Sequence, residues 1–124
     1  MTTTAPAPAR TLVETITQAL ADRDAAALAA CYAPDATFLL VNAANPPGSP
    51  VRLAGRSAIH EYVAAIPAGI VMSVEDSLVG TDGRVVLSTT CRFPEGGQAC
   101  DVMLLTLDAD GLIADHQMIE VADS

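Results

Sequence analysis

The amino-acid sequence predicts an α+β fold in which N-terminal helices pack on a strongly bent antiparallel sheet. Its first half contains segments with apolar residues at helical spacing. Its second half is a series of long apolar runs separated by glycine-bearing turns, which is typical of antiparallel hairpins. No repeat or linker divides the 124 residues, so we expect a flexible leader at residues 1–10 and a single domain over residues 11–124.

The N-terminal part of the chain predicts a leader followed by an amphipathic helix. The leader is rich in Thr, Ala and Pro, and it lacks the basic segment and apolar run of a signal peptide. The helix is expected over residues 10–24, where Leu12, Ile16 and Leu20 recur on one face. We therefore expect that face to be buried against the rest of the domain.

A short second helix and a first strand are expected next. Asp22 or Asp24 can cap a helix over residues 25–33, and Pro34 would end it. The segment at residues 36–42 is rich in β-branched and aromatic side chains, so it predicts a strand.

A loop and a third helix complete the first half. Three prolines within residues 45–50 cannot join a hydrogen-bonded ladder, so this segment predicts a loop. Ser57 can then cap a helix over residues 58–66, which Pro67 ends. His60 follows the apolar Ile59, so we expect its side chain to face water.

Composition excludes several functional classes. The net charge is −9, with six arginines and no lysine, which disfavours nucleic acid and anionic membranes as partners. Missing lysine also excludes Schiff-base catalysis and the phosphate-binding P-loop. No apolar stretch reaches the ~18 residues of a membrane span. Three cysteines without a secretory signal favour reduced thiols in the cytoplasm, and two histidines offer no metal-ligand spacing.

Three segments of the chain resemble a known superfamily. The stretches "ALADRDAAALAACYAPDATFLL", "GRSAIHEYV" and "LTLDADGLIADHQMIEV" are similar to the SnoaL-like and ketosteroid-isomerase-like branch of the nuclear transport factor 2-like (NTF2-like) superfamily. The resemblance covers the chain from about Thr11 to Val121. It implies a cone-shaped domain in which helices close one side of a bent sheet around a pocket for a small apolar molecule. Such a fold does not fix a reaction.

The catalytic residues of two related enzyme groups are missing. At the positions that match the base, the oxyanion-hole tyrosine and the protonated acid of ketosteroid isomerases, this chain has Leu40, Ile16 and Met103. The resemblance therefore excludes steroid isomerisation by that machinery. The late acid of limonene-epoxide-hydrolase-like enzymes matches Met118, so that set is incomplete too.

The SnoaL-like polyketide cyclases offer a nearer match. They place one His and one Asp on the last two strands, facing the pocket. Here those strands carry Asp101 and His116, with the residue types exchanged between the strands. Neither residue needs a metal or an organic cofactor to transfer a proton.

The register of the last hairpin decides how Asp101 and His116 lie relative to each other. A turn over residues 108–111 pairs Met103 with His116 and Asp101 with Met118, and this is the register we expect. A turn at residues 110–111 alone instead sets His116 opposite Leu105 and Asp101 opposite Glu120. That alternative separates Asp101 and His116 by four residues, or on the order of 13 Å.

The preceding hairpin predicts a partner for Asp101. A two- or four-residue loop within residues 94–97 puts Arg92 on the same sheet face as Asp101, and we expect the guanidinium to reach the carboxylate. Cys91 and Phe93 would then lie on the outer face.

The candidate site therefore has two catalytic and eight binding residues. Asp101 and His116 are the catalytic candidates. Alternatively, Asp101 is a structural partner of Arg92, and His116 is a histidine of the core or of a dimer interface. Tyr32 can be a pocket wall or a hydroxyl donor, and Glu120 can be solvated. The expected binding residues are Arg92, Tyr32, Phe38, Leu40, Tyr62, Met103, Met118 and Glu120.

The sequence favours one function and leaves another open. The first is a cofactor-free acid/base enzyme, a cyclase, isomerase or hydrolase, acting on a small apolar oxygenated metabolite. The alternative is a non-catalytic module that binds a small ligand or a protein. We also expect a homodimer through the outer sheet face, because Val102, Leu104 and Ile119 would leave that face apolar.

Overall fold

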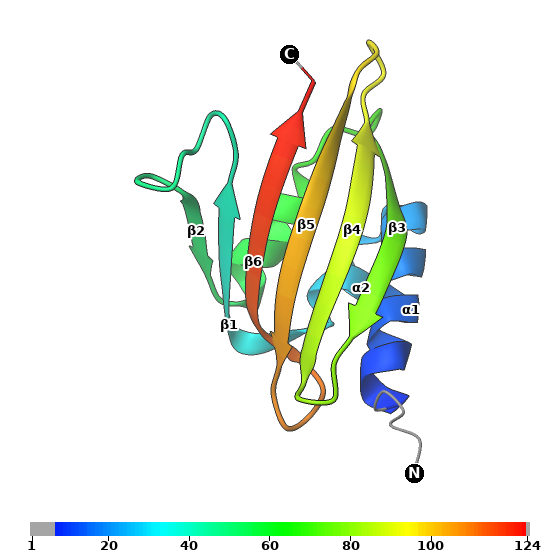
Figure 1. The fold of residues 1–124 in the computed structure, drawn as a ribbon, viewed down its shortest axis with the longest axis vertical. Coiled ribbons are helices and arrows are strands. Elements are labelled where there is room, and N and C mark those ends of the chain that lie inside the picture. Colours follow the sequence, from blue (N-terminus) through cyan, green and yellow to red (C-terminus); the bar gives the residue numbers. More distant parts are fainter. Residues whose placement is uncertain (1–6, 124) are drawn as a thin grey trace.

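The computed structural model describes residues 7–123 and confirms the α+β fold class. Three helices and six strands form one layer of helices against one sheet (Figure 1). In chain order these are α1 (Ala7–Asp22), α2 (Ala25–Ala29), β1 (Tyr32–Val41), β2 (Val51–Ala54), α3 (Arg56–Ala64), β3 (Val71–Val79), β4 (Arg84–Arg92), β5 (Gln98–Leu107) and β6 (Ile113–Ala122).

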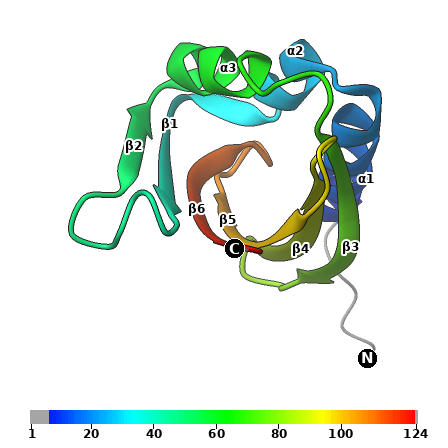
Figure 2. The ribbon, with the colours of Figure 1, turned by 90° about the horizontal axis from the view of Figure 1, so that it is seen from above.

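The sheet is curled so strongly that both of its edges meet the helices. Its strand order is β2-β1-β6-β5-β4-β3, and every pair is antiparallel except β1 with β6, which is parallel. Seen from above, β2 lies beside α3 and β3 lies beside α1 (Figure 2). The helices therefore close the concave side of the sheet, and side chains on that side can surround a small volume.

Helix α1 buries the face that its spacing predicts. Leu12, Ile16 and Leu20 are all buried in the core. The helix begins at Ala7, so residues 7–10 of the expected leader form its first turn. The rest of that leader, residues 1–6, lies outside the described residues.

The second helix is shorter than the sequence predicts. The Asp24 carboxylate accepts a hydrogen bond from the Ala27 backbone N–H, which confirms Asp24 as the cap. The helix ends at Ala29, however, and Tyr32 already belongs to β1. Pro34 does not end a helix but lies in β1, within an irregularity of the β1–β6 ladder between Tyr32 and Thr37. A proline is tolerated there because the ladder hydrogen bonds are interrupted.

The last hairpin adopts the alternative register rather than the expected one. His116 lies opposite Leu105, and Asp101 lies opposite Glu120. The Asp108 carboxylate accepts hydrogen bonds from two backbone N–H groups, of Asp110 and Leu112, and thereby shapes the turn. The ladder also shifts between Thr106 and Leu107. The resulting offset from the expected register is two residues, so every side chain keeps its predicted face.

The β4–β5 hairpin differs from the prediction by an odd number of residues. The Phe93 backbone N–H donates the hydrogen bond that closes the loop to the Gly97 carbonyl, which leaves three residues, 94–96, within the loop. Gly96 supplies a left-handed conformation there, with a φ of 99°. Asp101 consequently lies opposite Thr89, and Arg92 lies opposite Gln98. The prediction that Arg92 reaches Asp101 is wrong, because Arg92 is exposed on the other face.

The outer sheet face is apolar at the positions that the sequence predicts. Val102 is 47% exposed, Leu104 45% and Ile119 55%. Within residues 7–123, no helix is long and apolar enough to cross a membrane.

Candidate active site

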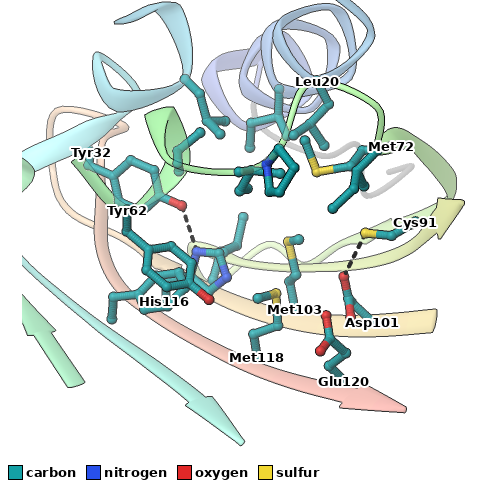
Figure 3. A pocket seen from close by; sticks show the side chains of 18 of the residues that line it. Leu20, Tyr32, Tyr62, Met72, Cys91, Asp101, Met103, His116, Met118 and Glu120 are labelled. Carbon is teal, nitrogen blue, oxygen red and sulfur yellow. Dashed lines mark hydrogen bonds between the residues drawn. The ribbon is translucent and has the colours of Figure 1, made fainter. Parts of the chain in front are cut away.

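The concave side of the sheet encloses a cavity of about 230 Å³. Its wall is formed by the helices, by the loop after α3 and by strands β1 and β3–β6 (Figure 3). The lining residues are predominantly apolar: Ile16, Leu20, Leu28, Tyr32, Phe38, Tyr62, Val63, Ile66, Pro67, Ile70, Met72, Cys91, Phe93, Asp101, Met103, Leu105, His116, Met118 and Glu120. An apolar lining with a few polar groups is the character of sites for organic molecules, and the volume limits the occupant to a small one.

The polar groups lie at two separate ends of the cavity. His116 and Tyr32 form the inner end, whereas Asp101 and Glu120 form the outer end (Figure 3). Met103 and Met118, which lie opposite each other on β5 and β6, occupy the floor between these ends. The cavity thus has an apolar middle and two chemically different polar ends.

His116 is held as a neutral imidazole. Its Nδ1 atom lies 2.6 Å from the Tyr32 hydroxyl, and its ring packs against Phe38 with the centroids 4.6 Å apart. The side chain is only 3% exposed, and burial lowers the pKa of His116 to about 4. At neutral pH the ring therefore carries no charge.

The hydrogen bond from Tyr32 assigns the tautomer of His116. Burial raises the pKa of the Tyr32 phenol, so the phenol keeps its proton. No other acceptor for this hydroxyl is found among residues 7–123, and the proton is satisfied only if it is donated to Nδ1. Nε2 then carries the imidazole proton. Nε2 is buried and has no protein partner in the described part of the chain, so it can donate to a molecule in the cavity.

Asp101 is buried at the outer end with one oxygen satisfied. Its Oδ2 accepts hydrogen bonds from Thr89 Oγ1 at 3.3 Å and from Cys91 Sγ at 3.6 Å. Its Oδ1 is buried and has no partner among the residues that the structure describes. Burial, together with the charge of Glu120, raises the pKa of Asp101 to about 6. The carboxyl therefore gains and loses its proton close to neutral pH.

Glu120 faces Asp101 from the neighbouring strand and is half-buried. Asn42, just beyond β1, donates a hydrogen bond from Nδ2 to its Oε1 at 3.1 Å. This contact orients the carboxylate beside Asp101. Tyr62 also lines the cavity, where burial and then the charges of Glu120 and Asp101 raise the pKa of its phenol.

One arginine holds the loop that covers part of the cavity. The guanidinium of Arg23 donates hydrogen bonds to the backbone carbonyls of Ile66, Pro67 and Ile70. These three residues also line the cavity. Arg23 itself has a φ of 56°, which allows the chain to turn sharply between α1 and α2. The position of this part of the cavity wall thus depends on hydrogen bonds from Arg23, which does not itself line the cavity.

The structure places eight of the ten predicted site residues in the cavity. These are Asp101, His116, Tyr32, Phe38, Tyr62, Met103, Met118 and Glu120. Leu40 is buried in the core but does not line the cavity, and Arg92 lies on the exposed face of β4. Asp101 and His116 share one cavity, but they do not form a contact pair.

Two residues of β4 that contact Asp101, Thr89 and Cys91, are not among the predicted site residues. Cys91 and Phe93 are predicted on the outer face, but both line the cavity, because the loop before β5 has three residues rather than an even number. Two consecutive glycines, Gly96 and Gly97, were the available signal for a three-residue loop with a left-handed residue. No group of three or more potential metal ligands occurs within the described residues.

Helices closing a curled six-stranded sheet around an apolar cavity define a protein of the NTF2-like fold class. Solved structures with this architecture superpose well. An NTF2-like protein of unknown function from Mesorhizobium loti is 21% identical, with a TM-score of 0.77, and the match covers 94% of this chain and 92% of that one. A steroid delta-isomerase from Pseudomonas aeruginosa is 21% identical, with a TM-score of 0.73 and coverage of 96% and 83%.

A third structure, a protein of unknown function with a cystatin-like fold from Methylobium petroleophilum, is 16% identical, with a TM-score of 0.79 and coverage of 99% and 82%. No curated protein sequence matches the chain. The family model of the SnoaL-like domain matches residues 13–116, and the chain therefore belongs to the SnoaL-like domain family.

Proposed function

We propose that this protein is a cofactor-free acid/base enzyme, an isomerase or cyclase, that acts on a small apolar oxygenated metabolite. The observation that carries the proposal is the pair of carboxyl groups at the outer end of an otherwise apolar cavity. Asp101 and Glu120 lie directly opposite each other, and the pKa of Asp101 is raised to about 6. Two carboxyl groups whose environments differ can supply an acid and a base at the same place.

Each carboxyl group has a role in this proposal. Asp101, with its raised pKa, is the acid, and Glu120, oriented by Asn42, is the base. For a ketone bound between them, the Glu120 carboxylate takes a proton from the carbon next to the carbonyl. The electron pair of that C–H bond forms a C=C bond, and the carbonyl oxygen takes the proton of Asp101. The pair holds one proton before and after the step. In a substrate whose new C=C bond is conjugated with a second one, Glu120 returns its proton to the far carbon while Asp101 takes back the proton on oxygen, and this completes an isomerisation.

The apolar cavity supports this chemistry in two ways. It excludes water from the enolate-like state, and it lets a neutral carboxyl group persist near neutral pH. General acid and base groups contribute about 10²–10⁴-fold to a rate, which is a useful acceleration for a proton transfer at carbon.

Ligand binding without chemistry is the second candidate function. The observation that favours it is the register of the last hairpin, in which His116 and Asp101 are four residues apart along the sheet. This offset is on the order of 13 Å, so these two residues do not act on one carbonyl group. A carrier would use both polar ends to hold a molecule and neither to move a proton.

Hydrogen–deuterium exchange at carbon tests the enzyme proposal without a known substrate. We would incubate the protein in D₂O with 2-tetralone and 4-phenylbutan-2-one and follow deuterium uptake by mass spectrometry. The wild type is expected to exceed background, and Asp101→Asn and Glu120→Gln are expected to lose that excess. Glu61→Gln, at an exposed site on α3, is the matched control. Excess exchange that survives in both cavity variants contradicts the proposal, as does binding of both ketones without exchange.

The outer sheet face supports a second proposal, a homodimer. Val102, Leu104 and Ile119 are exposed together on β5 and β6, and an apolar face of this kind on a small acidic protein favours a second copy as its cover. Light scattering at tens of micromolar protein should return twice the chain mass, and Leu104→Glu should return the single mass. A single mass for the wild type would contradict the dimer.

The free cysteines support a reducing compartment such as the cytoplasm. Cys31, Cys91 and Cys100 are all free thiols. Such thiols persist where glutathione and thioredoxin keep them reduced.

A further inference from the structure

We propose that the natural substrate carries a second oxygen atom, remote from the reacting group, which accepts a hydrogen bond from Nε2 of His116. This inference rests on the proposed function, because it takes the outer carboxyl pair as the place of reaction. It assigns His116 to recognition rather than to proton transfer. The substrate class is therefore an elongated apolar molecule with an oxygen function at each end.

The first support is the fixed donor at the inner end. His116 is 3% exposed, and its Nδ1 is already occupied by the Tyr32 hydroxyl at 2.6 Å. Its ring lines the cavity, and its Nε2 is buried and has no protein partner within residues 7–123. A buried donor without a partner is costly, whereas a ligand oxygen placed against it removes that cost. A carbonyl, ether or hydroxyl oxygen can accept this hydrogen bond, but a hydrocarbon group cannot.

The second support is the unpaired oxygen at the outer end. Oδ1 of Asp101 is likewise buried and without a protein partner among the described residues. In the enol form of the substrate, the reacting oxygen would donate its proton to this atom. In the keto form, the same oxygen would accept the proton back. Asp101 and His116 line the same cavity, so we infer that one molecule can satisfy both unpaired atoms.

The spacing between the ends defines the shape of the molecule. Glu120 and His116 are four residues apart on β6, which corresponds to about 13 Å between their Cα atoms. Met103 and Met118 lie between them and offer only apolar contact, and Phe38 and Tyr62 form an adjacent aromatic pair with centroids 5.6 Å apart. An apolar spacer containing a ring fits this middle section. A substrate of one small polar group alone would leave one end unsatisfied.

A set of three related probes tests the two-ended recognition. The compound 4-(4-hydroxyphenyl)butan-2-one carries a carbonyl at one end and a phenol, which is a stable enol, at the other. The compound 4-phenylbutan-2-one lacks the phenol, and 4-butylphenol lacks the carbonyl. Titration calorimetry should show that the two-ended compound binds about tenfold more tightly than either of the others, as expected for one additional hydrogen bond to a buried group.

Variants of His116 identify which end of the probe it holds. His116→Leu should lower the affinity for the two-ended compound about tenfold and leave 4-butylphenol, whose phenol occupies the outer end, unchanged. His116→Gln, which keeps a donor, should restore part of the loss. Equal losses for all three probes would show a merely structural role for His116 and would overturn the inference. Equal affinities of the wild type for the three probes would overturn it as well.

The tautomer of His116 gives a measurement that needs no ligand and no activity. Nitrogen-15 NMR should show one ring with its proton fixed on Nε2, whereas the exposed His60 gives averaged signals. A proton found on Nδ1 overturns the inference, because Nε2 would then be an acceptor. These results stand apart from the exchange assay. If the wild type shows no exchange above background but binds the three probes as predicted, the proposed reaction is refuted and the recognition role of His116 stands.

Discussion

His116 at the inner end and Asp101 at the outer end are equally buried, but their pKa values shift in opposite directions. His116 and Asp101 are each 3% exposed, and burial disfavours the charged form of both. The pKa of His116 falls to about 4, so this end is uncharged at neutral pH, whereas the pKa of Asp101 rises to about 6. The directions differ because the charged form of an imidazole is the protonated one, whereas the charged form of a carboxyl group is the deprotonated one; the charge of Glu120 adds to the rise at Asp101. Burial thus leaves an uncharged group at one end and a group that titrates near neutral pH at the other.

The largest effect is expected on proton transfer at the outer end. Asp101→Asn should lower the rate of deuterium exchange by about 10²–10³-fold, because an amide cannot act as the acid. In the wild type the rate should fall as the pH rises through about 6, where Asp101 loses its proton. The measurement is exchange as a function of pH. A rate that rises through pH 6 would instead assign Asp101 as the base.

The second effect concerns the pH dependence of folding stability. The folded-state pKa of His116 lies below its unfolded value of 6.5, so the unfolded chain binds more protons between pH 4 and 6.5. This residue therefore makes the free energy of unfolding rise with pH over that range. The folded-state pKa of Asp101 lies above 3.8, so the folded chain binds more protons up to pH 6, and stability falls with pH. In the wild type the two contributions oppose each other between pH 4 and 6.

Single variants should separate these opposing contributions. In Asp101→Asn the free energy of unfolding should increase from pH 4 to 6.5, and in His116→Leu it should decrease over pH 4 to 6. Each change is on the order of 2 kcal/mol across the window. Urea unfolding at several pH values measures both slopes. Parallel pH profiles for the two variants would show that the ends do not differ in the way described.

A smaller effect is expected when the phenol at the inner end is removed. Tyr32→Phe leaves Nδ1 of His116 buried without its donor, which should cost about 1–3 kcal/mol of folding stability. Tyr62→Phe, at a half-buried site of the same cavity, should cost less. Thermal unfolding compares the two. Equal losses of stability would argue against the hydrogen bond from Tyr32 to Nδ1 of His116 as a stabilising contact.

The smallest effect is expected in the β4–β5 loop, whose length decides which side chains of β4 face the cavity. Gly96 has a φ of 99°, in a conformation that favours glycine, and a Cβ there meets no atom within 4 Å. Gly96→Ala should therefore cost about 1 kcal/mol from backbone strain alone. Gly48→Ala, also in open space but without a positive φ, should cost less. Urea unfolding measures this difference as a shift in the denaturant midpoint at an unchanged m-value.

The outcome for the candidate site shows what sequence patterns can and cannot predict. Alternation placed Asp101 and His116 on one sheet face, and the family resemblance identified that face as the concave one. The placement survived a two-residue error in register because the period of a strand is two. The same reasoning failed for Arg92, because the error at the preceding hairpin was odd. Both registers depend on loop details, namely a left-handed Gly96 and the hydrogen bonds of Asp108, which hydrophobic patterning does not report.

The helices show a related limit. The buried face of α1 follows from its spacing, since burial of Leu12 and Ile16 needs only helical geometry. The end of α2 does not follow from local preference, because Tyr32 is drawn into β1, where it pairs with Ile113 of the last strand. Tertiary pairing therefore overrides the proline signal, and it also brings the Tyr32 hydroxyl to His116.

The three-residue loop between β4 and β5 ties the chemistry of the cavity to the packing of the core. A one-residue slip of β4 would turn the whole strand over, with Arg92 moving inward and Cys91 outward. The same movement would carry Val85 and Leu87, which are fully buried, out toward water. Substitutions in the cavity wall can therefore change its chemistry one side chain at a time, whereas a change in the length of this loop would cost β4 its core side chains.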